Sequence, residues 1–327
     1  MSSRRPFPEP LDFQGLRTTS LKDRPSKVRL DDFCRPWEPG KPFGDFLDRL
    51  PKVLAAEGLC EAVRAIAAAF RGNRTILMGM GAHPIKVGLN PVLVDAMERG
   101  ILSGLALNGA GVVHDVELAL VGKTSEDVAA HLDQGQFGTA RETAEFIHGA
   151  VASVYQAGNT GLGLAVGRKL LQDRAPYNHT SLLATAAKLN IPVTVHVAVG
   201  TDIIHMHPMM DGAATGALSH YDFRLFCRLV STLQQGVFLN LGSAVIIPEV
   251  FLKAVSVARN LKFSLEGITT INMDFQRQYR TQVNVLERPT RGTGSGINLI
   301  GHHEIMFPLL MAAVLEKLDN EGRGGYR

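Results

Sequence analysis

Two glycine-rich turns, each lying between an apolar run and a helical pattern, constrain the fold of this chain most strongly. The apolar run 76–78 leads into the first turn, at 79–84. The apolar run 102–107 leads into the second turn, at 108–111. Between them, residues 93–101 place apolar side chains four apart, which is typical of one face of a helix. Two strand–turn–helix units in series predict a doubly wound, mainly parallel, Rossmann-like α/β sheet.

The remainder of the chain repeats this alternation of short apolar runs and amphipathic segments. No internal repeat or long linker interrupts it, so we expect one domain built on one sheet. The carboxyl ends of parallel strands lie at one edge of their sheet, and the turns that follow them should gather there. The strands are predicted to end near Met78, Leu107, Val197, Asn240 and Met273, with helices at 179–189, 221–234, 248–261 and 303–318.

The first 44 residues differ from the rest, since they hold seven prolines and no sustained periodicity. They predict an extended arm at 1–44, followed by a single α/β domain at 45–327. A disordered tail is one interpretation of the arm. The other is an arm that lies on its own or a neighbouring subunit, which four aromatic side chains favour: Phe7, Phe13, Phe33 and Trp37.

Composition narrows the classes of function. The formal net charge is only +3, and no Lys/Arg stripe alternates with aromatic residues, which argues against polynucleotide binding. No apolar stretch approaches the roughly 20 residues of a membrane span, and no signal peptide is recognisable. Three widely separated cysteines suit a reducing cytoplasm and form no zinc motif. We therefore expect a cytoplasmic protein that acts on a small molecule.

Several ionisable residues follow the predicted strands and are candidates for catalysis. His114 and Asp115 come directly after the second turn, and an imidazole can act as a general base or acid near neutral pH. Lys86 follows the first turn, where it could bind an anion or become a nucleophile once desolvated. Asp202 follows the strand predicted at 191–197 and could support His114. Each also has a structural interpretation, as a polar helix start or a surface lysine.

The two glycine turns are also predicted to hold a dinucleotide. Glycine lets the backbone approach a phosphate closely, and amides at a helix N-terminus can donate to its oxygens. The predicted cofactor-binding residues are Gly81, Ala82 and His83 in the first turn, and Asn108, Gly109, Ala110 and Gly111 in the second.

The segment 288–296 is rich in arginine and glycine and is predicted to be a loop that receives phosphate or carboxylate oxygens. Its candidate substrate-binding residues are Arg288, Arg291 and Ser295. A mobile surface loop with incidental arginines is the alternative. If the loop is functional, the substrate or the cofactor carries an anionic group.

Two further histidines, His205 and His302, are candidate substrate-binding residues near predicted strand ends. On a strand, His205 and His207 would share a face and could reach one metal ion. Paired histidines more often support a loop, so no metal site is predicted.

The order of these motifs resembles that of deoxyhypusine synthase, an NAD-dependent enzyme of spermidine chemistry. The resemblance covers about residues 45–318, and its five short motifs in the same order are fairly specific for the fold. It implies the same scaffold, bound NAD, a homotetramer and a small, polyamine-type substrate, and it adds Asp274 to the cofactor-binding candidates. The matching segments are Asn108–Asp115 (family TAGGVEED), Ala82–Gly88 (family SNLISSG), Ile191–Val193 with Thr201–Asp202, Ile271–Asn272, and Phe307–Leu310.

The departures from this family limit what the resemblance implies. The family forms an imine on a lysine within a WGK stretch, whereas no lysine lies between Lys262 and Lys317 here. His114 replaces an acidic residue of the family, and His302 replaces an aspartate. The lysine-imine step is therefore not carried over.

Three hypotheses follow. The first is an NAD-dependent enzyme of the deoxyhypusine synthase superfamily, which dehydrogenates an amine and transfers the resulting imine. The second is a non-redox enzyme on the same scaffold, which binds an anionic substrate through the segment 288–296. The third is a non-catalytic nucleotide-binding assembly protein, against which the clustered His and Asp residues argue.

Overall fold

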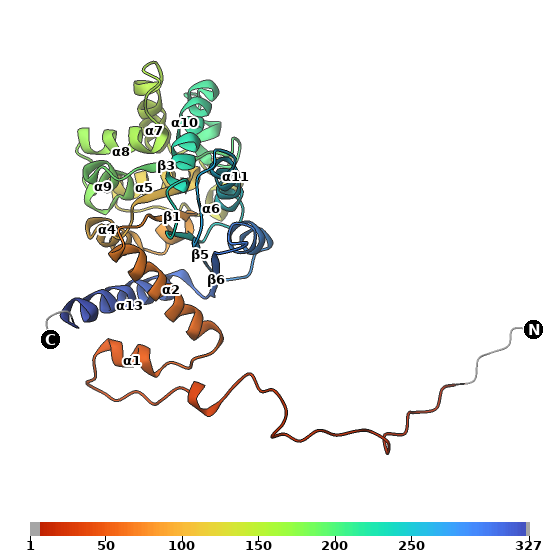
Figure 1. Cartoon of the computed structure of the whole chain (residues 1–327). Coiled ribbons are helices and arrows are strands. Elements are labelled where there is room, and N and C mark those ends of the chain that lie inside the picture. The colour runs from red at the N-terminus through yellow and green to blue at the C-terminus, as the bar shows by residue number, and fades with distance from the viewer. Residues whose placement is uncertain (1–6, 325–327) are drawn as a thin grey trace, which may run out of the picture.

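Six parallel strands form a single sheet in a computed structural model that describes residues 7–324 (Figure 1). Their order across the sheet is β3-β2-β1-β4-β5-β6, and every neighbouring pair is parallel. This is a doubly wound order that reverses between β1 and β4, so the predicted fold class is confirmed. The strands are β1 (Ile76–Met80), β2 (Gly104–Asn108), β3 (Val193–His196), β4 (Val237–Leu241), β5 (Thr269–Asp274) and β6 (Ser295–Ile300).

The larger hydrophobic core lies on one face of the sheet. Alternate strand residues, such as Met78, Leu107 and Leu239, point into it because successive side chains of a strand face opposite ways. In Figure 1, α2 and α13 lie side by side beneath the sheet and pack on each other; α2 also packs on β6, and α13 on β5. The helices of this face are α2 (Leu54–Arg71), α4 (Asn90–Glu98), α5 (Gly109–Val121), α7 (Arg141–Tyr155), α8 (Leu162–Gln172), α9 (Leu182–Leu189) and α13 (His303–Gly324).

A second core lies on the opposite face. The Phe238 ring from β4 stacks on the Phe251 ring, with centroids 3.7 Å apart, and both side chains are fully buried. The elements of this face are α10 (Gly212–Val230), which also reaches the first core, α11 (Ile246–Asn260), and the short α12 (Tyr279–Thr281) with the π-helical segment η4 (Gln282–Glu287). Helices on both faces explain why the strands are nearly continuous apolar runs.

The five predicted strands are all present, and each ends within two residues of its predicted end. A sixth strand, β6, was missed. The segment 288–296 was expected to be a loop, yet Ser295 and Gly296 already pair with Thr269 and Thr270 of β5. A short strand that begins in a glycine-rich segment has too few apolar residues to be recognised by periodicity.

Four short elements follow strand ends or connect helices. Two of them, α3 (His83–Lys86) and the 3₁₀ turn η3 (Ile203–Met206), come soon after β1 and β3. The others are α6 (Val128–Leu132) and the 3₁₀ turn η2 (Asn178–Thr180).

Residues 7–42 contain only one short element, η1 (Leu30–Asp32). Their first part runs away from the rest of the chain (Figure 1), whereas Asp32 and Arg35 form backbone hydrogen bonds with Lys52 and Arg49. α1 (Phe43–Arg49) then packs against α13. The Trp37 ring meets Phe46 of α1 edge-on at 5.9 Å, whereas Phe7 and Phe13 are exposed.

Across residues 7–324, none of the helices combines the length and apolar character that crossing a bilayer requires.

Candidate functional site

A cavity of about 170 Å³ lies at the carboxyl edge of the sheet, between α3, the start of α5 and the segment after β3. Three of the four predicted catalytic residues line it: Lys86, His114 and Asp202. Ala110 of the second glycine turn also lines it, as do Glu117 and Glu126, which sequence analysis did not single out. The tertiary structure therefore brings together groups that are more than 100 residues apart.

His114 belongs to a hydrogen-bonded chain. The Thr124 hydroxyl donates to the Glu117 carboxylate, so its oxygen is free to accept from the imidazole. His114 Nδ1 lies 2.6 Å from Thr124 Oγ1 and 3.7 Å from Glu117 Oε2. These bonds assign the ring hydrogen to Nδ1 and leave Nε2 as a proton acceptor. This is the arrangement that a general base needs.

The cavity is acidic. Burial would raise the pKa of Glu117, but hydrogen bonds from His114 and Thr124 outweigh it and hold this pKa below its usual value. Glu117 is therefore ionised at neutral pH. Burial raises the pKa of Asp202, against the opposing influence of His205. Together with Glu126, these carboxyl groups outnumber Lys86, so a cationic ligand fits the cavity better than an anionic one.

Asp202 occupies the N-terminus of α5. The Ala110 amide donates to its carboxylate, and the Gly111 amide donates to Asn108 Oδ1 at 3.0 Å. A Cβ on Gly109 would lie 2.0 Å from Asp202 Oδ2, so this position needs glycine. Two of the amides that we predicted to hold a phosphate, those of Ala110 and Gly111, thus already have partners within the chain.

His205 and His207 do not share a ligand face. His205 lies in the 3₁₀ turn η3 and His207 just after it. Neither is on a strand, so the two side chains are not placed on one face as the shared metal site would require. His205 Nδ1 accepts hydrogen bonds from the Gly200 and Asp202 amides, while His207 Nδ1 accepts from Met209. Within residues 7–324, no three His, Cys, Asp or Glu side chains are grouped as metal ligands.

Asp115, the fourth predicted catalytic residue, is completely buried and does not line the cavity. Its carboxylate accepts hydrogen bonds from Ser181 and Asn90 and from the Leu182 and Leu183 amides, at 2.6–3.1 Å. Burial raises its pKa, and these bonds oppose the rise. This geometry gives Asp115 a structural position at the start of α9.

A second polar cluster lies where the strand order reverses. His83, the first residue of α3, has its Nδ1 2.8 Å from Nδ1 of His303, the first residue of α13. His303 Nε2 lies 3.8 Å from Asp274 Oδ1 at the end of β5. His83 and Asp274 were predicted to bind a cofactor. Of the neighbours His302 and His303, at most one was expected to face the site, and His302 was chosen; the structure buries His303 there and leaves the His302 side chain 72% exposed.

Glycines let the turns at this reversal point pack closely. A Cβ on Gly81 would lie 2.3 Å from the Gly242 carbonyl oxygen, and one on Gly242 would lie 2.8 Å from His303 Cε1. Ala82 follows Gly81 directly and precedes α3. The turns after β1 and β4 therefore pack against each other and against His303 at the reversal point, which is where doubly wound sheets bind ligands.

The arginine-rich segment lies at the opposite edge of the sheet. Arg288 and Arg291 precede β6, and Ser295 pairs with Thr269 at the start of β5. Arg288 donates to Asn284 Oδ1 at 2.8 Å. The structure does not bring this segment to the cavity or to His83.

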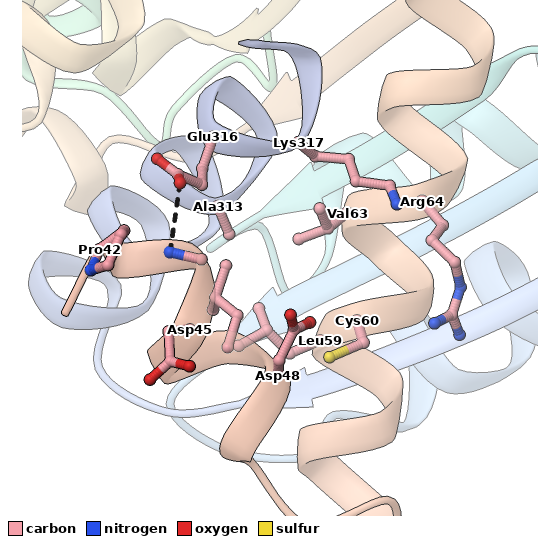
Figure 2. A pocket seen from close by; sticks show the side chains of 12 residues that line it. Pro42, Asp45, Asp48, Leu59, Cys60, Val63, Arg64, Ala313, Glu316 and Lys317 are labelled. Carbon is pink, nitrogen blue, oxygen red and sulfur yellow. Dashed lines mark hydrogen bonds between the residues drawn. The ribbon is translucent and has the colours of Figure 1, made fainter. Parts of the chain in front are cut away.

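A larger cavity of about 470 Å³ lies between α1, α2 and α13 (Figure 2). Asp45, Asp48, Cys60 and Arg64 line it, and the Gly44 amide donates to Glu316 across it at 3.3 Å. None of its lining residues comes from a turn after a strand. We therefore place the candidate site in the smaller cavity and the neighbouring reversal point.

Neither a family model nor a curated protein sequence matches this chain. Solved structures do share its fold. The chain is similar to AgrE in a ternary complex with ornithine and NAD+, with a TM-score of 0.53 and 13% identity over 83% of this chain and 35% of AgrE. It is also similar to a putative deoxyhypusine synthase from Entamoeba histolytica, with a TM-score of 0.50 and 11% identity over 86% of this chain and 96% of that one.

These similarities confirm the deoxyhypusine synthase-like resemblance at the level of the fold. Unliganded AgrE gives a TM-score of 0.51 at 13% identity. The chain spans about a third of the length of AgrE. The similarity to AgrE is therefore one of fold over about a third of that protein, which was solved in complex with ornithine and NAD+.

Proposed function

We propose that this chain is an NAD-dependent enzyme that dehydrogenates a small, positively charged amine and transfers the resulting imine. The acidic cavity carries the proposal, because it sets the Nε2 acceptor of His114 among the carboxyl groups of Glu117, Glu126 and Asp202. The shared fold with the ornithine- and NAD+-bound AgrE supports it.

The cavity matches an amine in charge and in chemistry. An ammonium group would be attracted by the carboxylates and could donate hydrogen bonds to them. His114 Nε2 would accept its proton, which leaves the nitrogen lone pair that a departing hydride requires. Glu117 would stabilise the imidazolium through Thr124.

NAD, when bound, would supply the hydride acceptor. We propose that the dinucleotide lies over the turns at the β1–β4 reversal point, where the backbone packs closely at Gly81 and Gly242. We propose that Gly81, Ala82, His83 and Asp274 border it. At Asn108–Gly111, Asp202 and Asn108 already accept amide hydrogen bonds, so we propose van der Waals contact there in place of a phosphate site.

Lys86 is the amine of this chain that lines the cavity. We propose that any imine formed on the protein forms there, since the family's own lysine has no counterpart. Borohydride reduction during turnover, followed by peptide mass spectrometry, should label Lys86 and leave residues 287–300 unlabelled. An adduct at Lys253, an exposed residue paired with Glu249, would place the imine outside the cavity.

Cofactor binding tests the proposal most directly. We expect mass spectrometry of the purified protein to detect a bound dinucleotide, or calorimetry to show NAD+ binding. Reduction of NAD+, followed by absorbance, should then depend on added polyamines or basic amino acids and not on their N-acetylated forms. Glu117→Gln should raise the KM for the amine and leave NAD+ affinity unchanged. If neither NAD+ nor NADH binds, the redox function is excluded.

A further inference from the structure

His83, His303 and Asp274 form a connected row at the carboxyl edge, although 191 residues separate His83 from Asp274. His303 and Asp274 are buried, while His83 is half-buried. The His303 ring is fixed against the backbone of the β4 turn, because a Cβ on Gly242 would touch it at 2.8 Å. His83 is thus the one member of the row that a ligand can reach.

The surroundings of His303 assign its tautomer. His303 Nε2 is buried without a hydrogen-bond partner, and the charged group that faces it at 3.8 Å is the Asp274 carboxylate, which can only accept. Nε2 therefore carries the hydrogen, and Nδ1 is an acceptor. Burial lowers the pKa of His303 despite the opposing charge of Asp274, so the ring is neutral at neutral pH.

The tautomer of His83 follows from that of His303. With Nδ1 of His303 accepting, the 2.8 Å contact requires Nδ1 of His83 to donate. Its Nε2 then holds a lone pair. An imidazole held through one nitrogen, with the other free to take a proton, is the orientation that the buried carboxylate imposes in hydrolase triads.

We infer that His83 is a catalytic residue that takes a proton through Nε2 from an alkylammonium ligand at the β1–β4 reversal point, and that His303 and Asp274 are its positioning residues. The ligand class rests on the proposed function and on Phe275. The Phe275 ring is 47% exposed and lies 5.8 Å from the His83 ring. An exposed aromatic face beside a lone pair suits an ammonium group, which both can attract.

The proton transfer complements the one assigned to His114. Moving an imine carbon from one nitrogen to another requires a proton transfer at each nitrogen. At His83, the N–H bond of the attacking ammonium breaks and the Nε2–H bond forms. The freed nitrogen lone pair then bonds to the imine carbon, while the C=N π pair moves to the first nitrogen, which takes the proton that His114 holds. A further proton passes from the new nitrogen to the first, which leaves as an amine as the new C=N bond forms. No electrons are exchanged with an oxidant in this step, because the hydride has left earlier.

The tautomers can be measured without any substrate. We would record long-range proton–nitrogen NMR spectra of the full chain labelled with nitrogen-15 histidine, and assign them with His83→Gln and His303→Gln. We expect His83 protonated at Nδ1 and His303 protonated at Nε2. His303→Phe, which removes the acceptor, should abolish the preference of His83 for Nδ1–H, whereas the exposed His302→Ala should not change it. A wild-type His83 protonated at Nε2 would overturn the inference.

Measurements of turnover can show whether the role of His83 fails or the proposed function fails. With an amine pair that the wild type converts, His83→Gln should lower kcat by about 10²–10⁴-fold. His303→Phe should also lower kcat, and His303→Gln should recover part of the loss. His220→Ala, at an exposed histidine of α10, should match the wild type. Wild-type kcat in His83→Gln would remove the catalytic role even if the tautomers are as expected. A wild type that oxidises no amine would refute the proposed function and the ammonium ligand, while the NMR result would still decide the positioning of His83.

Discussion

The pKa of the buried Asp222 carboxyl group is strongly shifted by its surroundings. It is completely buried on α10 and accepts hydrogen bonds from the Gly163 and Val195 amides at 3.1 and 2.9 Å. Burial raises its pKa from 3.8 to about 7, since these bonds and one from Leu162 offset only part of the loss of hydration. The group therefore changes charge within the physiological pH range.

This pKa predicts a pH-dependent stability. Because the folded state binds the proton of Asp222 more tightly than the unfolded state, its contribution is fully present below about pH 4 and is lost as pH rises through 7. The free energy of unfolding falls by about 4 kcal/mol at most over this pH range. Urea unfolding between pH 5 and 8 should show a smaller pH slope in Asp222→Asn than in the wild type. The exposed cap variant Asp211→Asn should keep the wild-type slope, and equal slopes in all three proteins would contradict the prediction.

Replacement of His114 should lower turnover strongly. Its Nε2 is free, and Thr124 and Glu117 hold its Nδ1, so His114→Ala should lower turnover by about 10²–10⁴-fold. The fold should be kept, because His114 lies in the wall of the cavity rather than in the hydrophobic core, and circular dichroism would check this. The exposed His179→Ala is the matched control. Unchanged turnover in His114→Ala would remove this residue from the mechanism.

At the scale of elements, three buried carboxylates each cap a helix N-terminus from a distant part of the chain. Asp115 caps α9, Asp222 caps α8 and Asp202 caps α5. A carboxylate at this end satisfies backbone amides and interacts favourably with the helix dipole. These contacts tie the helices between β2 and β3 to the sheet.

The cap on α9 should be among the costliest to remove. Asp115→Ala would leave Ser181, Asn90 and two amides without their acceptor, so we expect a loss of about 3 kcal/mol in the free energy of unfolding. Asp127→Ala, at the exposed N-cap of α6, should cost about 1 kcal/mol or less. Urea unfolding would compare the two variants. Similar losses would show that the buried hydrogen bonds of Asp115 contribute no more to stability than an exposed N-cap does.

In the second glycine turn, alanine substitutions at Gly109 and Gly111 should have different effects. Gly109→Ala would place a methyl group against Asp202 and should displace this carboxylate from α5. Gly111→Ala meets its nearest atom at 3.3 Å and should be milder. We therefore expect Gly109→Ala to lower both the melting temperature and ligand binding more than Gly111→Ala does. Equal effects on the two would argue against the packing of Asp202 that the structure shows.

At the scale of the whole molecule, the exposed apolar side chains of the extended arm indicate that another protein surface covers it. It exposes a run of large apolar side chains that water solvates poorly, and among residues 7–42 only Trp37 contacts an aromatic ring of the body. We predict that a second copy of the chain covers the arm and that the protein is a homotetramer. The exposed side chains are Phe7, Leu11, Phe13, Leu16, Leu21, Val28, Leu30 and Phe33.

Light scattering coupled to gel filtration would test the assembly. We expect the full chain to have the mass of a tetramer at micromolar concentration. Deletion of residues 1–28 should shift the mass towards smaller species without unfolding the α/β domain, which circular dichroism would confirm. A monomeric full chain would contradict both the tetramer and the role of the arm.

Local patterns in the sequence determined the main features of the fold. Apolar runs followed by glycine turns specify parallel strands, because only strands buried on both faces remain apolar on both sides. The topology of a parallel sheet then places every such turn at one edge. For that reason Lys86, His114 and Asp202 were predicted to be near one another, and the structure brings them to one cavity.

Only the tertiary structure decided which polar side chains face that edge. Asp115 follows His114 directly, but the helix turns it into the core, just as His303 is buried beside the exposed His302. Strand order also placed Arg288 and Arg291 at the opposite edge and set His83 against His303 across 220 residues. Sequence periodicity reports which residues are buried within one element. Contacts between elements depend on how the strands are ordered and how each helix is rotated, and those are set by packing across the whole core.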